Sequence, residues 1–117
     1  MKGRPLRSTL RDALLIAQVR GLAHLVMNGP ERLYDMTIVG TIPIAFVKLR
    51  FANRVLVDLA RIAREYQEEI RRLRMITRDP GISLELWLRS RYGTWRFFRV
   101  DAGSISEIDR AGTILLT

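Results

Sequence analysis

The chain has 117 residues, of which 48% are hydrophobic, and its formal net charge at pH 7 is +8. This length predicts a single domain over residues 1–117, with a core over about 8–100 and a tail over 101–117. No apolar run approaches the roughly 18 to 20 residues of a membrane span, so the sequence predicts a cytoplasmic protein that has no membrane partner. Cysteine is absent and His24 is the single histidine. Disulfides, thiolate zinc sites, cysteine nucleophiles and metal sites built on several histidines are therefore excluded.

Arginine supplies most of the positive charge, since 18 of the 20 cationic residues are arginine and two are lysine. The planar guanidinium group suits bidentate contacts with phosphate, and a net charge of +8 favours a polyanionic partner. The arginine excess taken alone is equally compatible with a compositional bias of the source genome. The net charge is the stronger argument for nucleic acid.

A helix and three strands are predicted in the first half of the chain. Residues 8–20 carry apolar side chains three and four apart, with Ser8 as a cap and Gly21 as a stop. Residues 22–27 are predicted as a buried strand that contains His24, which is interpreted as a structural residue and not as a ligand. Residues 33–39 and 44–50 are rich in β-branched and aromatic residues and predict the next two strands.

A helix and a hairpin are predicted in the second half. One apolar stripe at helical spacing runs over residues 55–74. Two strands follow at 82–89 and 94–100, and a short strand is expected at 105–108. Because a helix connects the third strand to the fourth, these two strands should be parallel. The fold class is thus α/β, with a central mixed sheet flanked by two helices and a C-terminal hairpin strand.

The stretch "YDMTIVGTIPIAFVKLRF" at residues 34–51 brings three charged side chains together. Asp35 opens the second strand, and Lys48 and Arg50 lie two residues apart on the third, so they project from the same face. The element order and this stretch resemble the restriction-endonuclease-like fold, or PD-(D/E)XK nuclease superfamily, and most closely its Holliday junction resolvase branch.

The resemblance implies an α-β-β-β-α-β core and a site for a catalytic metal ion. In that family an Asp on the second strand and a Glu-x-Lys or Asp-x-Lys on the third meet at the metal. Asp35 matches the Asp, whereas Lys48 falls on the acidic position and Arg50 on the lysine. The chain is therefore identified as a degenerate member of the superfamily.

These two replacements bear directly on catalysis. Hydrolysis of a phosphodiester by this family needs a hard cation held by carboxylates. A divalent ion about 4 Å from the Lys48 ammonium would be opposed by roughly 8 kcal/mol at an effective dielectric constant of 20. We therefore expect no metal or other cofactor, an Asp35 neutralised by Lys48 or Arg50, and an inactive protein that binds nucleic acid, DNA being favoured, or a nuclease partner.

Two alternatives stay open. Some restriction endonucleases take the second acid from the helix after the third strand. Glu65, Glu68 and Glu69 lie on that helix here, and Glu65 is the best placed of them. Asp35 and Glu65 would then bind Mg²⁺ in an active endonuclease or junction resolvase, unless the glutamates of this helix are solvated partners of its arginines. The other alternative is an oligomeric structural protein that has no role with nucleic acid. The apolar end "TILLT" could supply an interface for a homodimer.

The predicted nucleic-acid contacts are arginines on the third strand, the second helix and the hairpin. Cations crowd the end of the helix in greater number than its dipole requires, so a phosphate-binding patch is favoured there. Strand parity in the hairpin places Trp87, Arg89, Arg96 and Phe98 on one face, opposite Leu86, Leu88, Trp95 and Phe97. This mixed face is interpreted first as packed structure, with Trp87 over Arg96 as an internal cation–π pair, and second as a stacking surface for nucleic acid. The full set of predicted contacts is Arg50, Arg54, Arg71, Arg72, Arg74, Arg78, Arg89 and Arg96.

Overall fold

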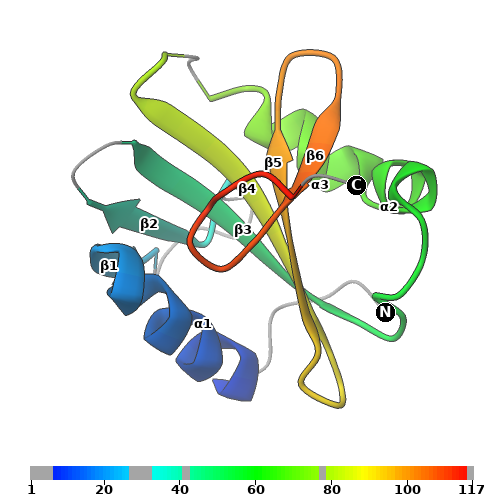
Figure 1. The fold of residues 1–117 in the computed structure, drawn as a ribbon, viewed down its shortest axis with the longest axis horizontal. Helices are drawn as coiled ribbons and strands as arrows, with labels where there is room; N and C mark the ends of the chain where they lie inside the picture. Colours follow the sequence, from blue (N-terminus) through cyan, green and yellow to red (C-terminus); the bar gives the residue numbers. More distant parts are fainter. Residues whose placement is uncertain (1–6, 27–32, 41–42, 77–78, 116–117) are drawn as a thin grey trace.

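A mixed sheet of six strands with helices on both faces forms the protein (Figure 1). The computed structural model describes residues 7–26, 33–40, 43–76 and 79–115. In chain order the elements are α1 (Arg7–Arg20), β1 (Leu22–Leu25), β2 (Met36–Val39), β3 (Ile44–Ala52), α2 (Leu59–Glu65), α3 (Gln67–Leu73), β4 (Ile82–Ser90), β5 (Trp95–Val100) and β6 (Ile105–Ile108). The strands lie in the sheet in the same order as in the chain.

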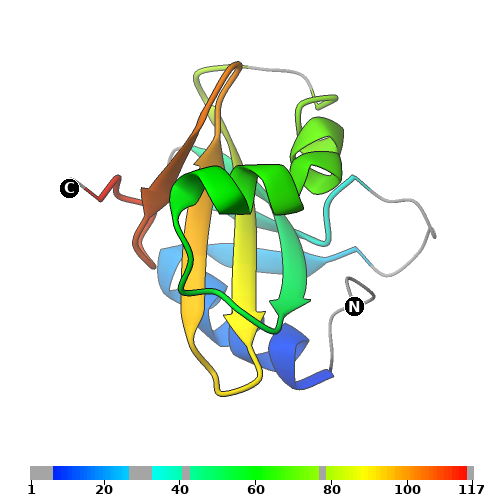
Figure 2. The same ribbon diagram turned by 90° about the vertical axis from the view of Figure 1, so that its right-hand side faces the viewer.

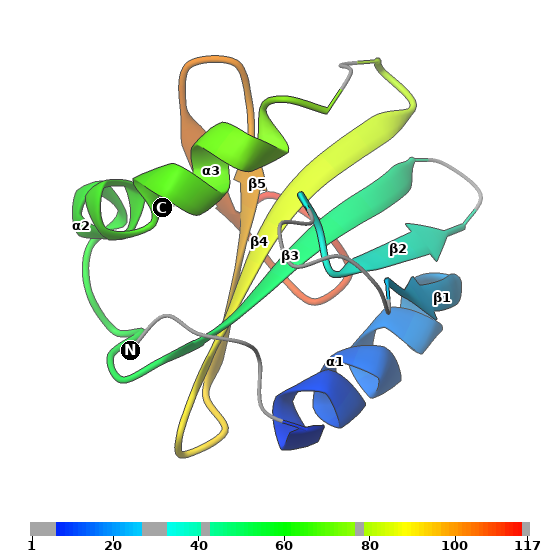
Figure 3. The same cartoon turned by 180° about the vertical axis from the view of Figure 1, so that it is seen from behind.

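The parallel pair expected from the sequence is confirmed. β3 and β4 pair in parallel from Ile44 with Ile82 to Ala52 with Ser90, and every other neighbouring pair of strands is antiparallel. The crossover between β3 and β4 contains α2 and α3, which cover one face of the sheet, while α1 covers the other (Figures 2 and 3). Within the described ranges, no helix is both long and apolar enough to cross a membrane.

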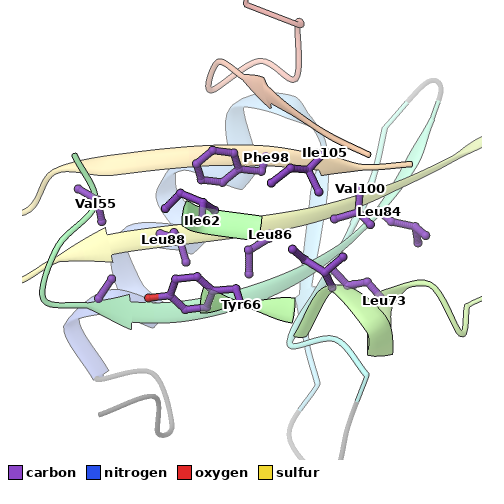
Figure 4. Packing of buried hydrophobic residues seen from close by; sticks show 12 residues of the cluster. Val55, Ile62, Tyr66, Leu73, Leu84, Leu86, Leu88, Phe98, Val100 and Ile105 are labelled. Atoms are coloured by element: carbon purple, nitrogen blue, oxygen red, sulfur yellow. The ribbon is translucent and has the colours of Figure 1, made fainter. Parts of the chain in front are cut away.

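The sheet separates two hydrophobic cores. Side chains alternate along a strand, so Ala45, Val47 and Leu49 of β3 pack on the α1 side. Lys48 and Arg50 consequently project toward α2 and α3. The core on that side (Figure 4) consists of Ala52, Val55, Ile62, Tyr66, Ile70, Leu73, Leu84, Leu86, Leu88, Phe98, Val100 and Ile105.

The single helix predicted over residues 55–74 is wrong in two respects. The helical region begins only at Leu59, because Asp58 has an extended backbone and its carboxylate accepts the N–H of Arg61 at 2.8 Å as an N-cap. The region is also broken at Tyr66, whose φ of −110° and ψ of 27° lie outside helical values and separate α2 from α3. The polar side chains of this region are therefore distributed over two short helices instead of one continuous helix.

The predicted parity of the hairpin is also wrong. Leu86 pairs with Phe98 and Leu88 pairs with Arg96, so even-numbered residues of both strands share the α2–α3 face. The cause is the connection over residues 90–94, which the Ser90 N–H closes onto the Thr94 carbonyl. The remaining aromatics, Trp87, Trp95 and Phe97, form a ring cluster on the α1 side. His24 is exposed on β1, outside the predicted buried environment.

Candidate functional site

Asp35 is fixed by backbone hydrogen bonds at the start of β2. Its N–H donates to the Val47 carbonyl at 2.7 Å, and its own carbonyl accepts the Val26 N–H at 2.8 Å. The carboxylate Oδ2 accepts the Leu49 N–H at 2.7 Å. The residue is only 2% exposed, so a buried negative charge lies against the middle of β3.

Both cations of β3 lie next to this carboxylate, as the sequence predicted. Lys48 Nζ is 3.7 Å from Asp35 Oδ1, and Arg50 Nη1 is 3.9 Å from Oδ2. The Lys48 side chain is 5% exposed and the Arg50 side chain 16% exposed. Opposite charges this close and this far from water interact more strongly than a surface pair does.

A second carboxylate, which the sequence reasoning ranked below Glu65, comes from α3. Glu69 Oε2 accepts a hydrogen bond from Arg50 Nε at 3.0 Å, and the residue is 5% exposed. Its other oxygen, Oε1, is buried and has no hydrogen-bond partner among the described residues. Lys48, Asp35, Arg50 and Glu69 thus form a buried charge cluster in which cations and carboxylates alternate and the formal charge sums to zero.

A spacing signal for Glu69 is present in the sequence. The buried residues Ile62, Tyr66 and Leu73 define one face of the helical region, and position 69 completes their alternating spacing of four, three and four. Glu65, the acid chosen from the sequence, lies at the edge of that face and is exposed.

Glu65 lines a hollow beside the charge cluster, at the end of β3. The hollow has a volume of about 290 Å³, and its walls are Phe51, Ala52, Asn53, Arg54, Arg61, Glu65 and Tyr66. Tyr66 lines this hollow, and Figure 4 shows its phenol oxygen directed along β3 toward the carboxyl end of the strand. Burial and, after it, the charges of Glu65 and Glu69 together raise the pKa of Tyr66 to about 12, while the charge of Arg50 acts to lower it. The phenol is therefore neutral at physiological pH.

The charge cluster does not fit a catalytic divalent ion. Such an ion takes oxygen ligands, and in this cluster Lys48 and Arg50 stand within 4 Å of the Asp35 carboxylate. Across the described ranges there is no group of three or more His, Cys, Asp or Glu side chains placed to hold a metal.

The arginines predicted at the end of the helical region are engaged within the protein. Arg71 and Arg72 both bond to Glu68, at 2.6 Å and 3.2 Å, and these contacts lower the pKa of Glu68 to about 2. Arg74 donates to the carbonyls of Asp101 and Ser104. Arg78 lies outside the described residues.

The predicted hairpin arginines are likewise paired. Arg89 lies 3.2 Å from the Asp12 carboxylate on α1. Arg96 binds Glu107 through two hydrogen bonds and also donates to the carbonyls of Val55 and Val57, so it ties the loop before α2 to the sheet. Arg54, by contrast, is exposed on the rim of the hollow.

The chain matches no protein-family model and no curated protein sequence. Among solved structures, it resembles Hjc, a Holliday junction resolvase from the archaeal hyperthermophile Archaeoglobus fulgidus, with a TM-score of 0.57. The two sequences are 19% identical over 87% of this chain and 86% of that chain. The restriction-endonuclease-like fold predicted from the sequence is thereby confirmed.

Proposed function

We propose that this chain is a catalytically inactive nuclease-fold protein that binds nucleic acid, with DNA as the favoured partner. The observation that carries the proposal is the position of Arg50 between the carboxylates of Asp35 and Glu69. The nuclease motif holds a metal ion between its acids, and here the side-chain cations of Arg50 and Lys48 neutralise the two acids.

A metal ion would have to displace Arg50 to enter the charge cluster. The displaced guanidinium would lose its partners in a site where its side chain is only 16% exposed, and an unpaired buried charge is strongly unfavourable. Lys48 would remain close to the ion and oppose it by roughly 8 kcal/mol at 4 Å and an effective dielectric constant of 20. Activation of a water by a bound metal is therefore not expected.

Binding of nucleic acid is supported by the charge that remains outside the cluster. The cluster itself is neutral, so the net charge of +8 comes from the rest of the chain. Exposed arginine guanidinium groups contact phosphates without reading sequence, and such binding weakens as salt rises. We expect weak sequence preference together with strong salt dependence.

Two measurements on the purified protein test the proposal. The first incubates linear DNA and a four-way junction with the protein and Mg²⁺ or Mn²⁺, and we expect no cleavage. The second follows fluorescence anisotropy of labelled DNA at about 50 mM and about 200 mM salt, where affinity should fall steeply. Absence of binding at the lower salt would refute nucleic-acid binding.

An active nuclease is the second candidate, because Glu69 is a buried acid on the helical region after β3. In this version Asp35 and Glu69 would hold the metal, and Glu65 would not take part. Metal-dependent cleavage that is lost in Asp35→Ala and Glu69→Ala but retained in Glu65→Ala would establish it. That pattern would also overturn the inactive assignment.

The homodimer predicted from the sequence remains a proposal. Of the apolar tail, Ile114 and Leu115 are each 44% exposed, while residues 116–117 lie outside the described part. The structural-protein alternative expects internal ion pairs for the arginines, as seen for Arg71, Arg89 and Arg96. Size-exclusion chromatography with light scattering gives the oligomeric state. An oligomer that fails to bind DNA would favour the structural-protein alternative.

A further inference from the structure

We infer that nucleic acid binds at the carboxyl end of the parallel strands β3 and β4, on residues outside the charge cluster. The contact surface, called the carboxyl-end surface below, consists of Asn53, Arg54, Arg61, Arg91 and Tyr92. The inference rests on the proposed function and assigns the place and the side chains of the contact.

The topology brings the two parts of this surface together. Ala52 at the end of β3 pairs in parallel register with Ser90 at the end of β4. The loop after β3 and the turn after β4 therefore leave the sheet at the same edge, as Figures 1 and 2 show. Residues 53 and 54 follow the first strand, and residues 91 and 92 follow the second. Their exposed side chains are available to one ligand.

The hollow at the end of β3 has the chemistry of a phosphate site. Two guanidinium groups, of Arg54 and Arg61, and the amide of Asn53 line it, and these are donors to phosphate oxygens. Glu65 is the single carboxylate among its lining residues, so the lining keeps a net positive charge. A volume of about 290 Å³ accommodates a small group such as a backbone phosphate with its sugar.

Tyr92 supplies an aromatic face on the adjoining turn. The residue is 81% exposed, and the guanidinium carbon of Arg91 lies 5.1 Å from the centre of its ring. An exposed tyrosine adds little to the hydrophobic core, whereas aromatic rings beside arginines are the platforms on which unpaired bases stack. The surface thus combines phosphate contacts with one stacking position, as expected for a single-stranded or branched nucleic acid.

The arginines of the carboxyl-end surface differ in ion pairing from those at the end of α3. Within the described part of the chain, Arg54, Arg61 and Arg91 form no ion pair with a carboxylate, whereas Arg71 and Arg72 share Glu68. A phosphate would have to compete with Glu68 for Arg71 and Arg72. The double variant Arg71→Gln/Arg72→Gln removes the same charge as Arg54→Gln/Arg61→Gln, which makes it a matched control.

The test measures binding of a fluorescent single strand and of a duplex by anisotropy over a range of salt concentrations. If each arginine contacts one phosphate, Arg54→Gln/Arg61→Gln should reduce the log–log salt slope by about 1.8 for the duplex and about 1.4 for the single strand. The matched control should keep the wild-type slope. Tyr92→Leu should weaken single-strand binding by about fivefold or more and duplex binding less. Thermal melting verifies that each variant is folded.

The outcomes of this test distinguish failure of the carboxyl-end surface from failure of the proposed function. A wild-type protein that binds no nucleic acid at about 50 mM salt refutes both. Wild-type binding whose slope falls in Arg71→Gln/Arg72→Gln and not in Arg54→Gln/Arg61→Gln refutes the carboxyl-end surface and leaves the proposed function standing. A lower slope confined to Arg54→Gln/Arg61→Gln, together with the loss in Tyr92→Leu, supports the inference.

Discussion

Arg50 of β3 and Glu69 of α3 are joined by a partly buried hydrogen bond of 3.0 Å between Nε and Oε2. This contact links the sheet to the helix that packs on it, 19 residues further along the chain. Arg50 also lies 3.9 Å from the Asp35 carboxylate, so the bond belongs to the charge cluster. The pair is therefore both a structural tie and the reason why a metal is not expected.

Replacing Glu69 should destabilise the protein more than replacing its neighbour. Glu69→Gln leaves the buried Arg50 with one charged partner fewer, and we expect a loss of about 2 kcal/mol in the free energy of unfolding. Glu65→Gln, one turn away on an exposed side chain, is the control and should change little. Urea denaturation of both variants measures the difference. Equal losses would show that the buried pair contributes no more than a solvated glutamate.

Restoring the nuclease pattern should create affinity for a metal ion. In the double variant Lys48→Glu/Arg50→Lys, three carboxylates face the same space and one cation has been removed. We expect Mn²⁺ at about 100 times its dissociation constant to stabilise this variant by about 2.7 kcal/mol, and to leave the wild type unchanged. Thermal melting with and without Mn²⁺ checks this. A shift of equal size in the wild type would contradict the metal-replacement argument.

The carboxylate of Glu85 holds together the opposite face of the sheet. It is 1% exposed and accepts hydrogen bonds from Arg20, from the Ser83 hydroxyl and from the Trp87 indole. Glu85→Gln replaces one acceptor by a donor and leaves Arg20 without its buried counter-charge. We expect a loss of about 3 kcal/mol in the free energy of unfolding, measured in urea.

A matched control is available on the same sheet. Glu107 pairs with Arg96 through two hydrogen bonds but is 29% exposed, so water compensates part of its loss. Glu107→Gln should therefore destabilise the protein less than Glu85→Gln. Trp87 fluorescence should change in the Glu85 variant alone, because its indole donates to that carboxylate. The opposite order of stabilities would contradict this account.

Period-two alternation along strands was enough to predict the meeting of Asp35, Lys48 and Arg50. The strand geometry fixes which side chains share a face, and the antiparallel pairing of β2 with β3 brings Asp35 beside β3. The parallel pairing of β3 and β4 followed in the same way from the helical crossover. These features depend on short segments and on general rules of chain topology.

Contacts between distant segments could not be read from the sequence. Arg20 and Glu85 are 65 residues apart, and nothing local marks them as partners. Glu69 was ranked below Glu65 for a different reason, because Glu65 was predicted to lie beside the apolar stripe of the helix. The structure instead buries Glu69 and leaves Glu65 exposed. The hairpin parity failed because the length of its turn decides which strand positions face each other.

Tyr66 predicts the behaviour of the protein at alkaline pH. Burial, and then the charges of Glu65 and Glu69, raise its pKa in the folded state from 10.0 to about 12. A group whose pKa is raised on folding contributes its full stabilisation below the pKa of the unfolded chain, and that contribution disappears as pH rises through the folded value. The free energy of unfolding should therefore fall between pH 10 and about 12.

Comparison of variants isolates this titration from that of other groups. Tyr66→Phe has no phenol to ionise, so its free energy of unfolding should fall less over the same pH range than that of the wild type. Tyr92→Phe is the control, because Tyr92 is 81% exposed and its removal should leave the pH profile of the wild type in place. Urea denaturation at several alkaline pH values gives the three profiles. Identical profiles for the wild type and Tyr66→Phe would show that the phenol does not couple ionisation to folding, which would contradict the burial of Tyr66 in the core.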